Sequence, residues 1–349
     1  MAVPFTQFAS SVLDNYDTRL HDSLKAANGV VAIMGMRGRI RVEVGGGPNF
    51  RGRVLYAGGS NGDFRGKNAE IPTNEPEGET MWSVPQRFYT TSMVINQIDR
   101  DQIRGKWALG NLLEDRMRQM ETEYVQDVAA ALLVAIPAAN APYSILPSGT
   151  SGEINGILSP VAPASAAGTT AGISRADNSW WRNQYTTTAI DMSAEAGDAS
   201  LYQNAYAPCL FGAAKADAPD FGLTSFPIFG VIGADASSKR RGTLQEQGVS
   251  KLGFNNLVYY NATLIQEAST RIASKIAFLN TNYLGIKVLQ PSGGRLRQMD
   301  QNNNLGSIPL VVREFQRDIT TLNDVATGYI TFALVAELLR VHGLADNVS

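Results

Sequence analysis

Cysteine and histidine are scarce in this chain, and their scarcity excludes several kinds of site. The single cysteine, Cys209, excludes an internal disulfide and a zinc cluster held by thiolates. The two histidines are His21, in an expected terminal helix, and His342, near the C-terminus. A Ser–His–Asp catalytic site would therefore have to use one of these two residues.

Charge is also sparse, and long apolar runs are missing. Charged residues make up 18% of the chain, against about 25% in an average globular protein, and the formal net charge is −2. This balance excludes a histone-like DNA-binding protein, and low charge in a large chain is typical of subunits that hide surface against neighbours. The sequence contains no run of about 18 apolar residues, so it predicts no membrane span. The first 20 residues, "MAVPFTQFASSVLDNYDTRL", lack the pattern of a signal peptide. We expect a soluble, intracellular protein without a membrane partner.

The motifs that could carry chemistry are all incomplete. "GGSNG" has the spacing of a serine-hydrolase nucleophile around Ser60, but glycine-rich hairpin replaces the strand and helix that such an elbow needs. "GDFRGKN" lacks the spacing and the Ser or Thr of a phosphate loop. "DQNNNLG" begins like a calcium loop at Asp300, but Leu305 stands where the loop needs glycine. We expect no enzyme and no metal or cofactor, and a hydrolase that uses Ser60 and a histidine is the remote alternative.

A long amphipathic helix at 100–136 is the clearest structural signal. Apolar residues recur at helical spacing on one face from Ile103 through Trp107 to Ala135, and charged residues occupy the other face. Pro137 ends the pattern. Because the stripe is one-sided and lasts several turns, we expect the helix to pack along a sheet or a hairpin.

Residues 30–98 have the pattern of a long projecting hairpin. Gly, Arg and Pro are frequent, and short alternating stretches such as "RIRVEV" predict strands. The charges are segregated into a basic limb followed by an acidic limb, which suits an arm lying on a neighbouring subunit of opposite charge. A solvated hairpin with chance clustering is the alternative. The arm hypothesis predicts contacts between subunits from these side chains: Arg37, Arg39, Arg41, Arg51, Arg53, Arg65, Lys67, Glu70, Glu75, Glu77 and Glu79.

The remaining segments predict a mixed second half. "LVYYNATLI", "KIAFLNTNYLGIKVL" and "IPLVVREF" predict strands, and residues 327–343 favour a strand because β-branched and aromatic residues precede Ala336. "FPIFGVIG" at 226–233 predicts a buried strand, followed by a helix. Residues 193–218 are Ala-rich and predict partial helix, and residues 5–27 predict a short amphipathic helix.

Two segments resemble tailed-bacteriophage major capsid proteins. "AGISRADNSWWRNQY", preceded by "EINGILSPVA", is similar to a segment that many members of that family share. "KLGFNNLVYYNATLI" followed by "IAFLNTNYLGIKV" resembles a second diagnostic stretch, in which a strand–turn–strand pattern leads into an "FLNTxYL" strand. The order of the elements also matches, and the resemblance covers roughly residues 30–349.

This resemblance implies an α+β Hong Kong 97-type capsid fold. Its members assemble as pentamers and hexamers into an icosahedral shell around packaged double-stranded DNA. The expected parts are an N-terminal arm (1–35), an extended β-hairpin loop or E-loop (36–95), a peripheral domain (96–189 and 306–349, with its spine helix at 102–136) and an axial domain (190–305). A bacterial nanocompartment shell of the same fold, which encloses enzymes in place of a genome, is the close alternative.

The resemblance also implies partners and a role for the tryptophan pair. The expected partners are further copies of the chain, a portal, a separate scaffold or decoration protein, and DNA bound non-specifically on the inner surface. The location would be a virion that is assembled in the host cytoplasm. Only about 28 residues precede the first strand, so we expect a mature chain or help from a separate scaffold. Trp180 and Trp181 are expected to wedge the peripheral sheet against the spine helix, and a ligand-binding role of the pair is the alternative. A structural core is expected to include these residues: Trp107, Trp180, Trp181 and Arg182.

Overall fold

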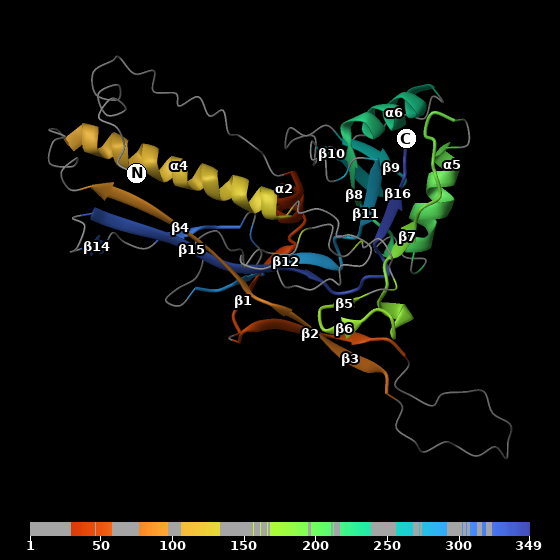
Figure 1. The fold of residues 1–349 in the computed structure, drawn as a ribbon, viewed down its shortest axis with the longest axis horizontal. Coiled ribbons are helices and arrows are strands. Elements are labelled where there is room, and N and C mark those ends of the chain that lie inside the picture. Colours follow the sequence, from red (N-terminus) through yellow and green to blue (C-terminus); the bar gives the residue numbers. More distant parts are fainter. Residues whose placement is uncertain are drawn as a thin grey trace. The chain divides into compact units, whose positions relative to one another are not determined.

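The fold of the chain is given by a computed structural model (Figure 1). It describes residues 29–45, 47–57, 77–96, 106–132, 168–194, 197–210, 217–238, 256–267, 274–291, 308–312, 316–318 and 323–349, with single positions at 156, 161, 166, 212, 272, 302 and 305. The helix predicted at 5–27 lies outside these residues. Within them, no helix is both long enough and apolar enough to cross a membrane.

The described residues belong to two compact units. The first is formed by Tyr89–Ala129 and Leu310–Ile330. The second is formed by Gly29–Phe88, Ala130–Pro309 and Thr331–Ser349.

The long helix α4, Lys106–Leu132, dominates the first unit. It lies within the predicted range 100–136, and its 27 residues extend about 40 Å at about 1.5 Å per residue. Figure 1 shows it running alongside β4 and β15. The strands of this unit are β4 (Arg87–Asn96), β13 (Val311–Val312), β14 (Gln316–Asp318) and the first part of β15 (Asn323–Ala336).

One face of α4 packs on these strands. Met120 is buried together with Met93 of β4 and Ala326 of β15. One turn later Tyr124 is buried, and its ring centre lies 5.0 Å from that of Tyr89. Residues four apart share one face of a helix, so the stripe seen in the sequence is the face that meets the strands. The predicted packing of this helix along a sheet is confirmed.

A six-stranded sheet with the order β7-β16-β11-β8-β10-β9, named here the β16 sheet, lies in the second unit. Its strands are β7 (Gln184–Thr186), β8 (Phe221–Ser225), β9 (Asn256–Tyr259), β10 (Ala262–Glu267), β11 (Lys275–Leu279) and β16 (Gly343–Asp346). Figure 1 shows α5 (Gly197–Leu201) and α6 (Phe226–Ser238) beside this sheet, with which they share one core. The strands predicted in "LVYYNATLI" and the partial helix predicted in 193–218 are confirmed.

The strand predicted at 226–233 is wrong, because these residues form the first turns of α6. The buried strand here is β8, which ends one residue earlier, at Ser225. Ile228 and Ile232 of α6 are buried four residues apart, as helical packing requires. A short apolar run does not by itself distinguish a buried strand from a buried helix. Pro227 is the better signal, because proline is favoured in the first turn of a helix.

The rest of the second unit combines short strands from distant parts of the chain. β1 (Ile40–Glu43), which follows helix α2 (Gly29–Met36), runs parallel to β12 (Leu284–Leu289), and β12 pairs antiparallel with the end of β15. Two further pairs are the β2–β3 ribbon (Asn49–Leu55 with Glu79–Pro85) and the β5–β6 hairpin (Thr169–Thr170 with Ile173–Ser174).

The observed sheets combine strands from both domains that the resemblance implies. β7 and β16 come from the ranges expected to be peripheral, yet they pair in the β16 sheet with strands from the axial range. β12 comes from the axial range, 190–305, yet it pairs with β1 and β15. Long-range pairing of this kind cannot be located from sequence ranges alone, because strand partners are far apart in the chain.

His342 is fully buried immediately before β16. Its exposed fraction is 0%, and its Nδ1 accepts a hydrogen bond from the backbone N–H of Asn280 at 3.1 Å. Burial lowers the pKa of His342 to about 3, because the charged imidazolium would lose its hydration. The folded protein therefore holds this side chain neutral.

We expect His342 to weaken the fold in acid. The unfolded chain binds the proton near the ordinary histidine pKa of about 6.5, whereas the folded chain binds it only near pH 3. The contribution of His342 to the free energy of unfolding is therefore fully present above pH 6.5. As the pH falls from 6.5 to 3, this contribution decreases by about 1.4 kcal/mol per pH unit. Urea unfolding of the wild type and of His342→Asn at several pH values measures this contribution. The variant should show the shallower decline, and equal slopes would contradict the assignment.

Candidate assembly interface

The β2–β3 ribbon has two faces of different character, because successive strand residues point to opposite sides. Phe50, Val54, Trp82 and Val84 lie on one face and are buried. The other face is exposed and carries Arg51, Arg53, Leu55, Glu79 and Met81. Leu55 and Met81 are 70% and 54% exposed. Two large apolar side chains beside two arginines make this outward face suitable for contact with another molecule.

Trp181 attaches the buried face of the ribbon to the rest of the second unit. It ends the short 3-10 helix η1 (Ser179–Trp181) and is 0% exposed. Its ring lies in one hydrophobic cluster with Phe50 and Trp82 of the ribbon and Val335 of β15. The indole N–H donates a 3.0 Å hydrogen bond to the carbonyl of Thr170, so its one polar group is satisfied.

Trp180 contacts the other end of the ribbon. Its ring stacks on Tyr56, the residue after β2, with ring centres 4.8 Å apart and planes at 11°. The same ring lies 5.7 Å from that of Trp181. Within the second unit, the pair packs against the ribbon and against Ala333 and Val335 of β15. The expected contact with the spine helix stays a prediction.

The residues that follow the tryptophans hold the local backbone. Arg182 donates from Nε to the carbonyl of Arg175 and from Nη2 to that of Ala176, each at 2.6 Å. Arg175 is itself fully buried and donates to the side-chain oxygen of Asn183. Arg182 thus serves within the subunit, by fixing the turn that carries the tryptophan pair.

The basic residues of the predicted arm do not share one surface. Arg37 forms an ion pair with Asp220, with Nη1 and Oδ2 2.7 Å apart, and Arg39 donates to the side chain of Asn282. Arg41 lies near Arg39 in the same pocket. Arg51 and Arg53 instead lie on the outward face of the ribbon, where Arg53 approaches Glu79 at 3.7 Å.

The placement of several predicted residues is not described. Glu77 is exposed just before β3. The following lie outside the described residues: Ser60, Arg65, Lys67, Glu70, Glu75 and the side chain of Trp107. The sequence hypothesis missed Leu55 and Met81, whose exposure becomes visible only once the register of the ribbon is known. It also missed Asp220, which no local motif connects to Arg37.

No family model and no curated protein sequence matches this chain. Solved structures do match along nearly the whole chain. The capsid asymmetric unit of cyanophage A-1(L) matches with a TM-score of 0.63 at 15% identity, covering 96% of this chain and 96% of that one. The capsid of an empty GTA particle matches with a TM-score of 0.56 at 12% identity, covering 97% and 96%.

A nanocompartment shell is also among the similar structures. The holo-SrpI encapsulin complex from Synechococcus elongatus PCC 7942 matches with a TM-score of 0.51 at 12% identity, covering 100% of this chain and 97% of that one. At these identities the likeness concerns the fold. Together with the capsid matches, it shows that the chain has the Hong Kong 97-type fold of phage capsid proteins, as its resemblance to that family predicts.

Proposed function

We propose that the chain is the major capsid protein of a tailed phage. It self-assembles into the pentamers and hexamers of an icosahedral shell that encloses double-stranded DNA. The observation that carries this proposal is the match to phage capsid structures over nearly the full length of both chains. In this function the chain acts as a structural protein of the virion, assembled in the host cytoplasm, and needs no catalytic site.

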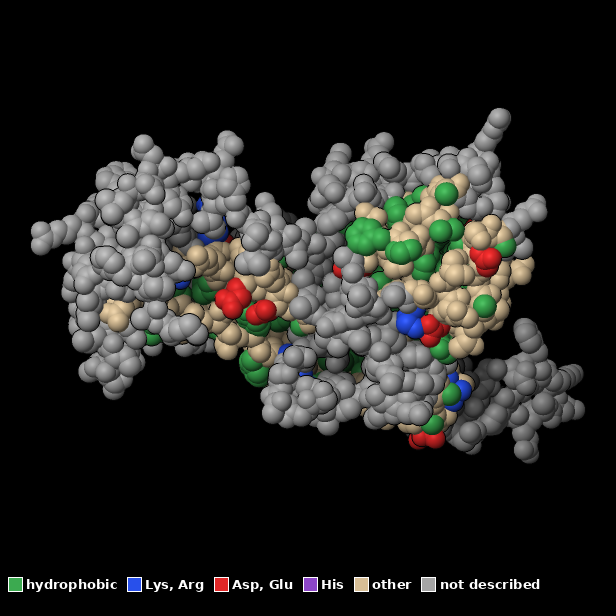
Figure 2. Space-filling view, turned by 45° about the horizontal axis from the view of Figure 1, so that its top comes forward, with side chains coloured by type: hydrophobic (Ala, Val, Ile, Leu, Met, Phe, Trp, Pro, Cys, Tyr) green, Lys and Arg blue, Asp and Glu red, His purple; other side chains and the backbone are tan. Residues whose placement is uncertain are grey.

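The surface of the second unit supports assembly. Phe226 at the start of α6 is 50% exposed, and Tyr260 in the β9–β10 turn is 58% exposed. Figure 2 shows apolar side chains gathered over the region of α5 and α6, with few charged groups among the described ones. Exposed apolar patches on a large protein mark contact sites with other molecules.

In this function the ribbon is part of the E-loop (36–95), and its outward face lies on a neighbouring copy of the chain. α4 is the spine helix, and the β16 sheet is the main part of the axial domain. The other partners are a portal, a separate scaffold or decoration protein, and DNA bound non-specifically along the inner surface.

Reversing the charge of the ribbon should weaken assembly. In Arg51→Glu/Arg53→Glu, two exposed cations of the outward face become anions, so contacts with an acidic neighbour turn repulsive. We expect the concentration needed for assembly to rise by about tenfold. Sedimentation velocity of the wild type and of the double variant measures this concentration. Arg51→Lys/Arg53→Lys, which keeps both positive charges, is the matched control.

The dependence of assembly on salt concentration is a second test of the same contact. At 1 M salt, screening reduces the range of electrostatic interactions to about 3 Å, so the wild type should assemble less readily at 1 M salt than at low salt. An assembly concentration that neither salt nor the double reversal changes would show that charge pairing does not hold the ribbon to its neighbour.

Sedimentation also tests the function as a whole. The purified chain, alone or with an adjacent scaffold gene product, should form species of five or six copies and larger particles. A monomer or dimer under every condition would contradict the proposal.

An encapsulin-like shell is the second candidate, favoured by the match to the SrpI complex. The content of particles from the native source separates the two functions. Nuclease-protected double-stranded DNA supports a phage capsid, and an enclosed protein without DNA supports a nanocompartment.

A further inference from the structure

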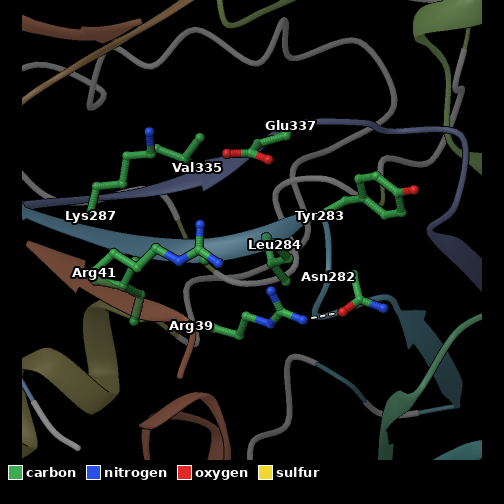
Figure 3. A pocket seen from close by; sticks show the side chains of 10 residues that line it. Arg39, Arg41, Asn282, Tyr283, Leu284, Lys287, Val335 and Glu337 are labelled. Carbon is green, nitrogen blue, oxygen red and sulfur yellow. Dashed lines mark hydrogen bonds between the residues drawn. The ribbon is translucent and has the colours of Figure 1, made fainter. Parts of the chain in front are cut away.

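A small pocket opens beside β1 and β12 in the second unit (Figure 3). Its volume is about 30 Å³, which admits one small group. Three cations and one carboxylate line it. Arg41 lies in β1, and Arg39 immediately precedes that strand. Lys287 lies in β12, Asn282 in the turn before β12, and Glu337 immediately after β15.

The register of the sheet brings the cations together. β1 runs parallel to β12, and Arg41 is the register partner of Lys287. Arg39 lies two residues before Arg41, so both side chains leave the same face of the strand. Figure 3 shows their guanidinium groups extending in the same direction. Like charges directly opposite each other destabilise a sheet unless an anion compensates them.

Compensation within the chain is incomplete. The Nζ of Lys287 lies 2.7 Å from Oε1 of Glu43 and 5.3 Å from the ring centre of Trp82. Arg39 and Arg41 form no ion pair among the described residues. Glu337 attracts Arg39 across the pocket without pairing with it. Asp220, which already pairs with Arg37, attracts Arg39 as well. Two carboxylates, Asp220 and Glu337, therefore face the three guanidinium groups of Arg37, Arg39 and Arg41, and one positive charge is left over.

Arg39 is affected most strongly by this deficit. It donates to the neutral amide oxygen of Asn282, and its Nε is buried without an acceptor among the described residues. Burial lowers the pKa of Arg39, and the nearby charge of Arg41 lowers it further. An anion in the pocket would offset both effects by accepting the free N–H groups.

We propose that this pocket binds one phosphate group, held by the guanidinium groups of Arg39 and Arg41. The planar donors of arginine match two oxygens of a phosphate. Arg41 is exposed, so the anion can enter from solvent and keep part of its hydration. The phosphate is either a free ion or part of a nucleic acid strand. This inference does not depend on shell assembly.

Calorimetric titration of the purified full chain with inorganic phosphate, at constant ionic strength, tests the pocket. We expect saturable binding of one phosphate per chain and an unfolding midpoint that rises with phosphate concentration. Arg41→Gln should bind about tenfold more weakly or not at all. Because the exposed Arg41 side chain forms no ion pair within the described part of the chain, this variant should remain folded. Arg51→Gln removes the same charge from the ribbon and should bind phosphate like the wild type.

Three results would overturn the proposal. They are the absence of saturable phosphate binding by the wild type, equal affinity in Arg41→Gln, and an acetate affinity equal to that for phosphate.

The source of the phosphate is tested by competition with a short DNA duplex. Duplex that displaces phosphate from the wild type identifies a backbone phosphate as the ligand, and phosphate that stays bound identifies the free ion. The duplex should displace phosphate from Arg51→Gln as strongly as from the wild type. That result would show that the competition takes place at the pocket and does not involve the ribbon.

Discussion

Replacing Trp181 with alanine is expected to lower the free energy of unfolding by about 3–5 kcal/mol. The side chain is 0% exposed and fills the space between the ribbon, the β5–β6 hairpin and β15. Its removal leaves a cavity that the surrounding strands cannot close, because their register is fixed by hydrogen bonds. The carbonyl of Thr170 also loses its donor. Urea unfolding of the unassembled subunit measures the change.

Trp180 supplies the matched control for this substitution. It has the same side chain one residue earlier, but it is only half-buried and contributes mainly its stacking on Tyr56. Trp180→Ala should therefore cost about 1–2 kcal/mol. If both alanine variants lost the same stability, the structural role assigned to Trp181 would be wrong.

Gly52→Ala is expected to destabilise the ribbon by about 3 kcal/mol or more, although it adds only one methyl group. Gly52 is the register partner of Trp82. A Cβ at this position would lie 2.2 Å from Cζ2 of the Trp82 ring and 2.5 Å from Cε2. The ring is 2% exposed and has Lys287 above it, so it cannot turn away without opening the core.

A smaller partner should relieve this clash. In the background of Trp82→Phe, the added methyl of Gly52→Ala should cost less than it does in the wild type, with a coupling of about 1–3 kcal/mol. Gly230→Ala is the control for the glycine change itself. Gly230 lies in α6, and a Cβ added there would meet no described atom within 4 Å, so alanine should stabilise the helix by about 0.5–1 kcal/mol. An equal loss in both backgrounds would rule out the contact with Trp82 as the cause.

The elements that the sequence predicts best are those with a long repeating pattern. α4 is recognisable because its apolar stripe recurs over many turns and ends before Pro137. α6 is mistaken for a strand, because its first eight residues are nearly all apolar and hide the helical period. Only six residues separate β16 from β15, yet the two strands belong to different sheets, because β16 pairs with β11 and β7. Such pairing depends on tertiary contacts that no local pattern contains.

The candidate interface is predictable only in part for the same reason. The charge segregation of the arm is visible in the sequence, and two of its basic residues, Arg51 and Arg53, are exposed on the ribbon. Their contact with a neighbouring subunit stays a prediction. Arg37 belongs to the same basic run, but its partner Asp220 lies 183 positions away. A run of like charges in the sequence therefore does not specify which members serve the fold and which face outward.

The central claim, that this chain forms a closed shell, is tested most directly by cryo-electron microscopy of its purified assemblies. The proposal predicts closed angular particles with five-fold and six-fold capsomers, into whose density this fold can be placed with the outward face of the ribbon against a neighbouring copy. Particles of any other architecture, or a uniform small oligomer that persists when an adjacent scaffold gene product is present, would contradict it.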